Sequence, residues 1–285
     1  MNTELYLEHL LQPFGINMAQ RIRLVRHQET GIDMRVMKRD GWFEYYQSYQ
    51  ERDVFADCDV LVSFFAGAGS HSVLEGVYVV NGVEGPVQIV PPEDYPYPEH
   101  ASSSKYLYCL ERDSRYDALC DRVVIDWGKG TRSWVQHFRP LTKPVIEVLP
   151  SGYVSEFPGY LECVVSYDEL KIIVENPTAN REWHRMLSAT YGIYLILDKE
   201  TGMQYVGSAY GIRGIIGRWT TYAETRHGGN KLLIDLLNQR PNAYRKWQFS
   251  ILQTLPMSMT KNEVIACEQL HKHKLGTRVH GLNDN

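Results

Sequence analysis

Two strand-like segments joined by a short turn constrain the fold of the last third of this chain more than any other feature. Residues 191–197 are mostly apolar or aromatic, residues 203–207 return with similar character, and Asp-Lys-Glu-Thr-Gly lies between them. Gly202, at the end of that turn, can adopt the positive φ that hairpin turns require. Because side chains on neighbouring strands share faces in a regular way, we expect Tyr194 and Tyr205 to point to the same side of this hairpin.

Helical and strand-like patterns follow the hairpin. We predict helices over residues 212–224 and 230–239 and a strand over residues 247–254, where the residues alternate in polarity. The sequence Thr-Lys-Asn-Glu is a capping box that opens a last helix over residues 260–275, and Gly276 fits its C-cap. The predicted order of this part of the chain is β-β-α-α-β-α.

The residues of this region match a known family in order and character. The segments Gly192–Tyr194 and Tyr205–Gly207 resemble the two halves of the GIY-YIG nuclease signature, with Val in place of the second Ile. Arg218, Glu268 and Asn283 follow in the order of the remaining family landmarks. The resemblance covers about the last third of the chain, and it implies a metal-dependent endonuclease domain that hydrolyses phosphodiester bonds in DNA.

The resemblance also implies a role for each of these residues: a tyrosine is the general base, Arg218 binds the phosphate and Glu268 holds Mg²⁺ or Mn²⁺. The chemistry agrees, because a guanidinium is always charged and binds phosphate bidentately. One carboxylate, completed by waters and substrate oxygens, is an acceptable Mg²⁺ site. A free tyrosine has a pKa of about 10 and needs a nearby cation to act as a base. Whether Tyr194 or Tyr205 is that base stays open.

Further positions extend the predicted site. Tyr222 lies one helical turn after Arg218, where relatives often carry His or Tyr, and so faces the same side of the helix. Asn283 matches the family's terminal asparagine, which is expected to hold the site together by hydrogen bonds. A helix beginning near Lys231 could bind a DNA phosphate at its N-terminus, although a capped helix start explains the same residues equally well. The predicted nucleic-acid contacts in this domain are Arg213, His227, Asn230 and Lys231.

Residues 1–175 have a different pattern, with short strands and frequent turn signals. Residues 59–66, 73–80 and 122–127 are strand-like, and the segment 84–100 carries five prolines. This pattern predicts a small barrel or sandwich. An apolar strand, a glycine break and a second apolar strand are similar to PUA-like and EVE-like barrels, which read modified or flipped bases or RNA.

A cluster of aromatic and basic residues around a glycine turn is the best binding candidate in this first domain. Residues 126–134 carry two tryptophans and two cations, which suit base stacking and phosphate contact. The alternative is a surface hairpin whose tryptophans pack inward. The residues that we predict to contact nucleic acid here are Trp127, Arg132 and Trp134.

Charge is distributed unevenly along the chain. Residues 176–285 hold 14 Lys and Arg against 8 Asp and Glu, a net charge of +6, whereas residues 1–175 hold 16 against 26, a net charge of −10. A basic C-terminal part fits a polyanionic partner such as DNA. The acidic N-terminal part does not fit a general DNA clamp, because nonspecific affinity comes mainly from Lys and Arg. It leaves room for a specific pocket reader, or for a protein-binding or autoinhibitory role.

Composition excludes several other classes. No apolar run approaches eighteen residues, so we expect no membrane span, and the N-terminus lacks the pattern of a secretory signal. The five cysteines are scattered without CxxC or zinc-ligand spacing. These features favour a cytoplasmic protein with reduced thiols.

Together these observations predict an α+β chain with two domains, residues 1–175 and residues 188–285. The leading hypothesis is a restriction or defence endonuclease directed to DNA by an N-terminal reader of sequence or modified bases. The alternatives are a structure-specific repair or recombination nickase and a nuclease-like module that binds nucleic acid without cutting it. One active site cuts one strand at a time, so double-strand cleavage would need a homodimer or sequential nicking.

Overall fold

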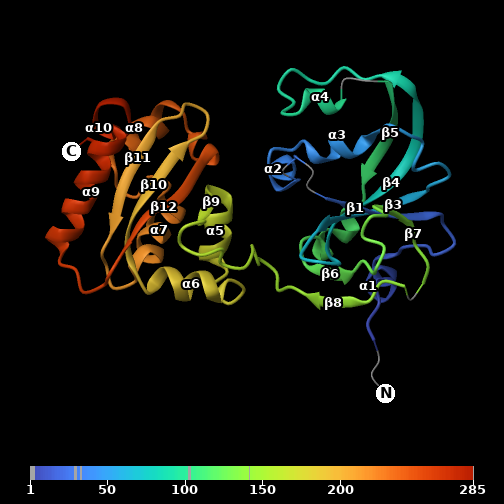
Figure 1. The fold of residues 1–285 in the computed structure, drawn as a ribbon, viewed down its shortest axis with the longest axis horizontal. Helices are drawn as coiled ribbons and strands as arrows, with labels where there is room; N and C mark the ends of the chain where they lie inside the picture. The colour runs from blue at the N-terminus through green and yellow to red at the C-terminus, as the bar shows by residue number, and fades with distance from the viewer. Residues whose placement is uncertain (1–3, 29–30, 33, 102–103, 141, 285) are drawn as a thin grey trace. The chain divides into compact units, whose positions relative to one another are not determined.

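The computed structural model describes residues 4–28, 31–32, 34–101, 104–140 and 142–284 (Figure 1). The chain forms two compact units, Met1–Leu149 and Pro150–Asn285. Within the described ranges, no helix has the length and apolar character needed to cross a membrane.

The first unit is built on one large curled sheet of eight strands (Figure 1). The strands pair in the order β2-β5-β4-β3-β1-β7, while β6 joins β4 to β8. Only the β1–β3 pair is parallel among the described pairings. In the described part of this unit no pairing joins β2 to β7, so the sheet curls without closing along this path. The strands are β1 (Ile22–His27), β2 (Tyr49–Gln50), β3 (Val60–Ala66), β4 (His71–Gln88), β5 (Ser104–Arg112), β6 (Val123–Asp126), β7 (Val135–His137) and β8 (Val145–Val148).

Both faces of this sheet are apolar and carry a core. Leu24 of β1 packs in one core and its neighbour Val25 in the other, because successive side chains of a strand point to opposite faces. Helix α1 and the 3₁₀ helix η2 contribute to the first core, and α2 and α3 contribute to the second. The helical segments are α1 (Leu7–Leu11), η1 (Gln12–Phe14), α2 (Met34–Arg39), α3 (Phe43–Ser48), α4 (Pro98–Ala101) and η2 (Ser114–Leu119).

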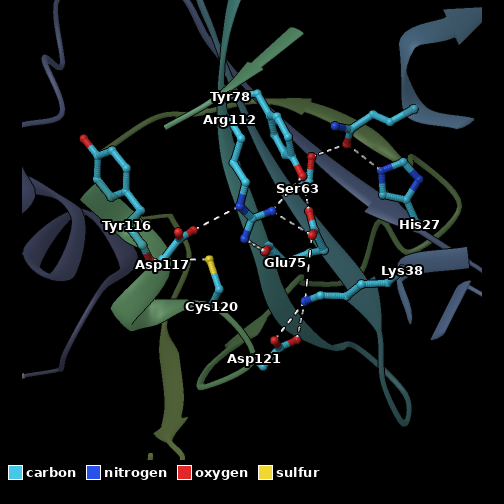
Figure 2. Close-up of polar contacts among 11 residues, drawn as sticks. His27, Lys38, Ser63, Glu75, Tyr78, Arg112, Tyr116, Asp117, Cys120 and Asp121 are labelled. Carbon is cyan, nitrogen blue, oxygen red and sulfur yellow. Dashed lines mark hydrogen bonds and ion pairs between the residues drawn. The ribbon is translucent and has the colours of Figure 1, made fainter. Parts of the chain in front are cut away.

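A buried ionic network ties helix α2 to the sheet (Figure 2). Glu75 of β4 is 1% exposed and accepts hydrogen bonds from Tyr78 Oη at 2.8 Å and from Arg112 Nη1 at 3.1 Å. The Nζ atom of Lys38, on α2, lies 3.8 Å from Glu75 and 2.7 Å from Asp121. Burial raises the pKa of Glu75, although both cations act in the opposite direction. Two cations and a phenol therefore satisfy this buried carboxylate from three different segments.

The second unit has a four-stranded antiparallel sheet in the order β11-β10-β12-β9. One face packs on α5, α6 and α7, and the other face packs on α9. The predicted order β-β-α-α-β-α after residue 188 is confirmed. The elements are β9 (Val164–Ser166), α5 (Tyr167–Glu175), α6 (Arg181–Ser188), β10 (Tyr191–Asp198), β11 (Gln204–Ala209), α7 (Gly214–Thr225), α8 (Lys231–Gln239), η3 (Ala243–Lys246), β12 (Trp247–Leu255), α9 (Lys261–Leu275) and α10 (Thr277–His280).

The boundary between the units differs from the one expected near residue 175. Residues 150–175 belong to the second unit, because β9 pairs with β12 and Leu170 and Ile173 of α5 are buried in its core. With the boundary at residue 149, the difference in net charge between the two parts of the chain is half of the difference calculated for a boundary at residue 175. Residues 150–285 hold 15 basic and 13 acidic residues, a net charge of +2, and residues 1–149 hold 15 and 21, a net charge of −6.

Candidate active site

The hairpin of β10 and β11 places its two tyrosines on one face of the second sheet. Tyr194 lies opposite Gly207, and Tyr205 lies opposite Ile196, so the two rings are diagonal neighbours with centroids 6.4 Å apart. A Cβ atom at Gly207 would overlap the Tyr194 hydroxyl. Glycine at this position therefore lets the Tyr194 ring lie across the neighbouring strand.

Helix α7 adds an arginine and a third tyrosine to this face. Arg218 Nε donates a hydrogen bond to Tyr194 Oη at 3.1 Å, and Arg218 Nη2 donates to Tyr222 Oη at 3.1 Å. The two tyrosine hydroxyls are 3.0 Å apart, and Arg218 Nη1 donates to the Gly228 carbonyl at 2.8 Å. Three hydrogen bonds thus hold the guanidinium. Tyr222 is four residues after Arg218, a spacing that places the two side chains on the same face of α7.

Burial decides the protonation of this cluster. Tyr194 and Tyr222 are 0% exposed. Burial, followed by the neighbouring phenols, raises the pKa of both hydroxyls, and the opposing effect of Arg218 is smaller. Burial by itself lowers the pKa of Arg218, but the negative charges that the neighbouring tyrosines would carry if ionised, together with the hydrogen bond to Tyr194, outweigh it and raise that pKa. The cluster therefore consists of neutral phenols around a permanent cation.

A cavity of about 460 Å³ opens beside this cluster. Tyr205, which is 8% exposed, lines it, whereas the fully buried Tyr194 and Tyr222 do not. The cavity brings together residues from β11, α7, α9 and the loop between β11 and α7. Its lining residues are Tyr205, Ser208, Ala209, Tyr210, Gly211, Arg213, Gly214, Gly217, Arg218, Thr221 and Glu268.

Glu268 of α9 reaches the cavity with both of its oxygens in contact with the protein. Ser208 Oγ donates a hydrogen bond to Oε2, and Lys272 Nζ lies 2.6 Å from Oε1. Each carboxylate oxygen has two lone pairs, so acceptor sites remain for a cation. Among the described residues there is no group of three or more His, Cys, Asp or Glu that could bind a metal. The donor set therefore fits one cation whose other ligands are waters and substrate oxygens.

Two contacts of Glu268, with Ser208 and with Lys272, were not predicted from the sequence. A signal for the second exists, because the spacing of four residues between Glu268 and Lys272 brings side chains together on a helix. The hydrogen bond between Ser208 and Glu268 joins residues 60 positions apart, and no sequence motif predicts it.

Asn283 lies outside the cavity and fastens the end of the chain. It is 3% exposed, its Nδ2 donates to the Val206 carbonyl at 2.8 Å, and its Oδ1 accepts from the Val206 amide at 2.9 Å. These two bonds act like an added strand pairing along β11. Asn283 therefore supports the strand that carries Tyr205 and Ser208.

The predicted nucleic-acid contacts of this unit separate into two groups. Arg213 lines the cavity, as do Tyr205 and Arg218. Asn230 accepts a hydrogen bond from the Leu233 amide at 2.9 Å and so caps α8. His227 and Lys231 lie beside that cap, where Lys231 Nζ is 3.8 Å from an Asp284 oxygen.

In the first unit the predicted stacking cluster packs inward. Trp127 is 1% exposed, belongs to a core, and its Nε1 donates to the Ser133 carbonyl at 3.0 Å. Its ring has no free face for a base, which differs from the expected binding role. Trp134 is half-buried against Phe55, and Arg132 is exposed. The inward packing of the alternative interpretation is thus observed for Trp127, although residues 127–134 form a loop and not a hairpin, because β6 pairs with β4 and β8 while β7 pairs with β1.

Comparisons with known proteins give little further information. No family model matches the chain, and no curated protein matches it. Among solved structures, the catalytic domain of the intron endonuclease I-TevI, in a mutant form, is similar to part of this chain. The two are 24% identical, the match covers 34% of this chain and 94% of that domain, and the TM-score is 0.27.

Proposed function

We propose that the second unit is a divalent-metal-dependent endonuclease that hydrolyses phosphodiester bonds in DNA. The observation that carries this proposal is one cavity lined by Tyr205, Arg213, Arg218 and Glu268. Two guanidiniums suit a phosphodiester, a carboxylate suits a metal ion, and a phenol suits a proton transfer.

The residues divide the work in the following way. Arg218 binds the scissile phosphate, and its contacts with Tyr194, Tyr222 and the Gly228 carbonyl fix the plane of the guanidinium. Such pre-organisation is what makes a charged group effective in a transition state. A metal bound at Glu268 would neutralise charge developing on the leaving oxygen.

Tyr205 is the tyrosine that we assign as general base. It lines the cavity and can reach an attacking water there, whereas the hydroxyls of Tyr194 and Tyr222 bond to each other and to Arg218 behind it. Burial also raises the pKa of Tyr194, so its hydroxyl stays protonated and is not available as a phenolate base. Arg213 at the cavity wall supplies a second cation for the DNA backbone.

We assign to the first unit the selection of the DNA target. The sequence pattern that resembles PUA-like barrels is the basis for a reader of modified bases, and this role fits a restriction enzyme against foreign DNA. Because Trp127 packs inward, the exposed Arg132 and the half-buried Trp134 remain as the proposed nucleic-acid contacts of this unit.

A cleavage panel tests both parts of the proposal. The full chain is incubated with Mg²⁺ or with EDTA and with plain, cytosine-modified and branched duplexes of one sequence. We expect Mg²⁺-dependent cleavage that is faster on one modified duplex. Equal cleavage of all linear duplexes would contradict the proposed role of the first unit as a reader of modified bases. A preference for branched DNA would favour a repair nickase over a restriction enzyme. Binding without cleavage in every metal would overturn the endonuclease.

A further inference from the structure

The charges around the cavity are unusual for a metal site. Glu268 is the one carboxylate among the described residues that line the cavity, and Arg213 and Arg218 line it as well. Lys272 lies behind the carboxylate, with its Nζ 2.6 Å from Glu268 Oε1. These four side chains together carry a net charge of +2.

Lys272 is fixed in this position by burial. Its side chain is 2% exposed and that of Glu268 is 14% exposed, so the pair is largely shielded from water. Coulomb interactions are several times stronger in such surroundings than in water. The negative charge of Glu268 is therefore largely cancelled before any metal ion arrives.

The geometry of Glu268 nevertheless leaves room for a cation. Ser208 and Lys272 each occupy one acceptor position of the carboxylate, and about four such positions exist on an ionised carboxylate. Contacts of this kind orient a ligand without displacing the metal. The site is thus shaped for a metal ion but, taken alone, repels one.

We propose that Lys272 is a positioning residue that makes metal binding depend on DNA. This inference rests on the proposed endonuclease function. The net positive cavity attracts a phosphodiester, whose oxygens supply both the missing negative charge and further metal ligands. The metal ion consequently enters with the scissile phosphate or after it, and the free protein binds the ion weakly. A nuclease that is loaded only on its substrate is also protected from unproductive metal binding.

Mn²⁺ binding to the full chain, measured by electron paramagnetic resonance, tests the proposal without any cleavage step. The free wild-type protein should bind Mn²⁺ weakly, and Lys272→Met should bind it at least roughly tenfold more tightly. Lys272→Arg keeps the charge and should resemble the wild type. Lys274→Met removes an exposed cation two residues further along the same helix and should change nothing. Glu268→Gln in the Lys272→Met background should abolish the gain.

A second measurement uses the wild type and therefore tests the proposal even if the Lys272→Met variant does not fold. Adding a cleavage-resistant phosphorothioate duplex should raise the Mn²⁺ affinity of the wild type at least roughly tenfold, after subtraction of the binding to DNA alone. Equal affinity with and without the duplex would overturn the inference, as would a folded Lys272→Met variant that binds Mn²⁺ no better. If the wild type binds Mn²⁺ tightly without DNA yet cuts DNA, this inference fails and the endonuclease stands. If the metal binding is as expected but no duplex is cut, the endonuclease fails.

Discussion

Each unit of this protein contains a buried cluster of arginine and tyrosine, and the two clusters differ in one respect. In the first unit, Arg112 contacts Tyr78 but also forms ion pairs with Glu75 at 3.1 Å and Asp117 at 3.0 Å (Figure 2). In the second unit, Arg218 contacts two tyrosines and a carbonyl, and no carboxylate of the described residues pairs with it.

The difference separates a structural network from a binding site. Arg112 is neutralised by Glu75 and Asp117, so it has no positive charge left to offer an anionic ligand, and the network serves to fasten β4, β5 and η2. Arg218 is held just as firmly by neutral groups, and its charge is directed to a cavity. Neutral partners position a cation without consuming its charge, and this is the condition for binding a phosphate.

The largest expected effect comes from removing the charge at the second cluster. Arg218→Met should lower the single-turnover rate of DNA cleavage by roughly 10³-fold, because one pre-organised transition-state contact is lost. Rates measured at saturating DNA and metal concentrations report this loss directly. A rate within a few-fold of the wild type would remove Arg218 from the active site.

The matching change in the first unit should affect stability instead. Arg112→Met leaves the buried Glu75 carboxylate with Lys38 as its remaining cation, so the free energy of unfolding should fall by about 3 kcal/mol. Urea unfolding followed by circular dichroism measures it. Cleavage of plain duplex below the unfolding transition should stay within twofold of the wild type. Lost cleavage with unchanged stability would reverse the assignment of the two clusters.

The first unit should also respond to pH. His27 is buried against Gln47, and burial lowers its pKa to about 4. The unfolded chain takes up this proton near pH 6.5, so stability is lost as the pH falls from about 6.5 towards 4. At pH 5 the loss should be about 2 kcal/mol. Urea unfolding at pH 7 and pH 5 checks it, and His27→Gln should remove this part of the slope. Identical slopes for the two proteins would contradict a neutral buried His27.

The smallest expected effect concerns the end of the chain. Asn283→Ala removes both side-chain hydrogen bonds to Val206 and should lower the free energy of unfolding by about 1 kcal/mol. Asp284→Ala, which removes an exposed ion pair with Lys231, should cost less than about 0.5 kcal/mol. Thermal unfolding of the two variants side by side measures the difference. Equal values would show that Asn283 does not support β11.

The sequence predicted the second unit well where the signals are local. The turn before Gly202, the capping box at Thr260 and the C-cap at Gly276 are each set by residues a few positions apart, and the structure contains all three. The pairing of Glu268 with Lys272 was not predicted, although their spacing of four residues on a helix is a local signal of the same kind.

Other features depended on contacts between distant residues. Pairing of β9 with β12 brings Val165 opposite Phe249, and no short-range pattern shows that this strand belongs to the second unit. Trp127 was predicted to stack on bases because two tryptophans and two cations surround a glycine turn, but its ring packs in a core against Phe64. The orientation of an aromatic residue is decided by packing, which a sequence pattern does not specify.

The central claim is that the cavity at Glu268 hydrolyses phosphodiester bonds. Single-turnover cleavage of one end-labelled duplex by the wild type, Glu268→Gln and Glu263→Gln tests it most directly. Glu263, on the first turn of the same helix, accepts hydrogen bonds from the capping residue Thr260 and lies outside the cavity. We predict Mg²⁺-dependent cleavage by the wild type and Glu263→Gln, and a rate at least roughly 10²-fold lower for Glu268→Gln. Equal rates for all three proteins would contradict the account.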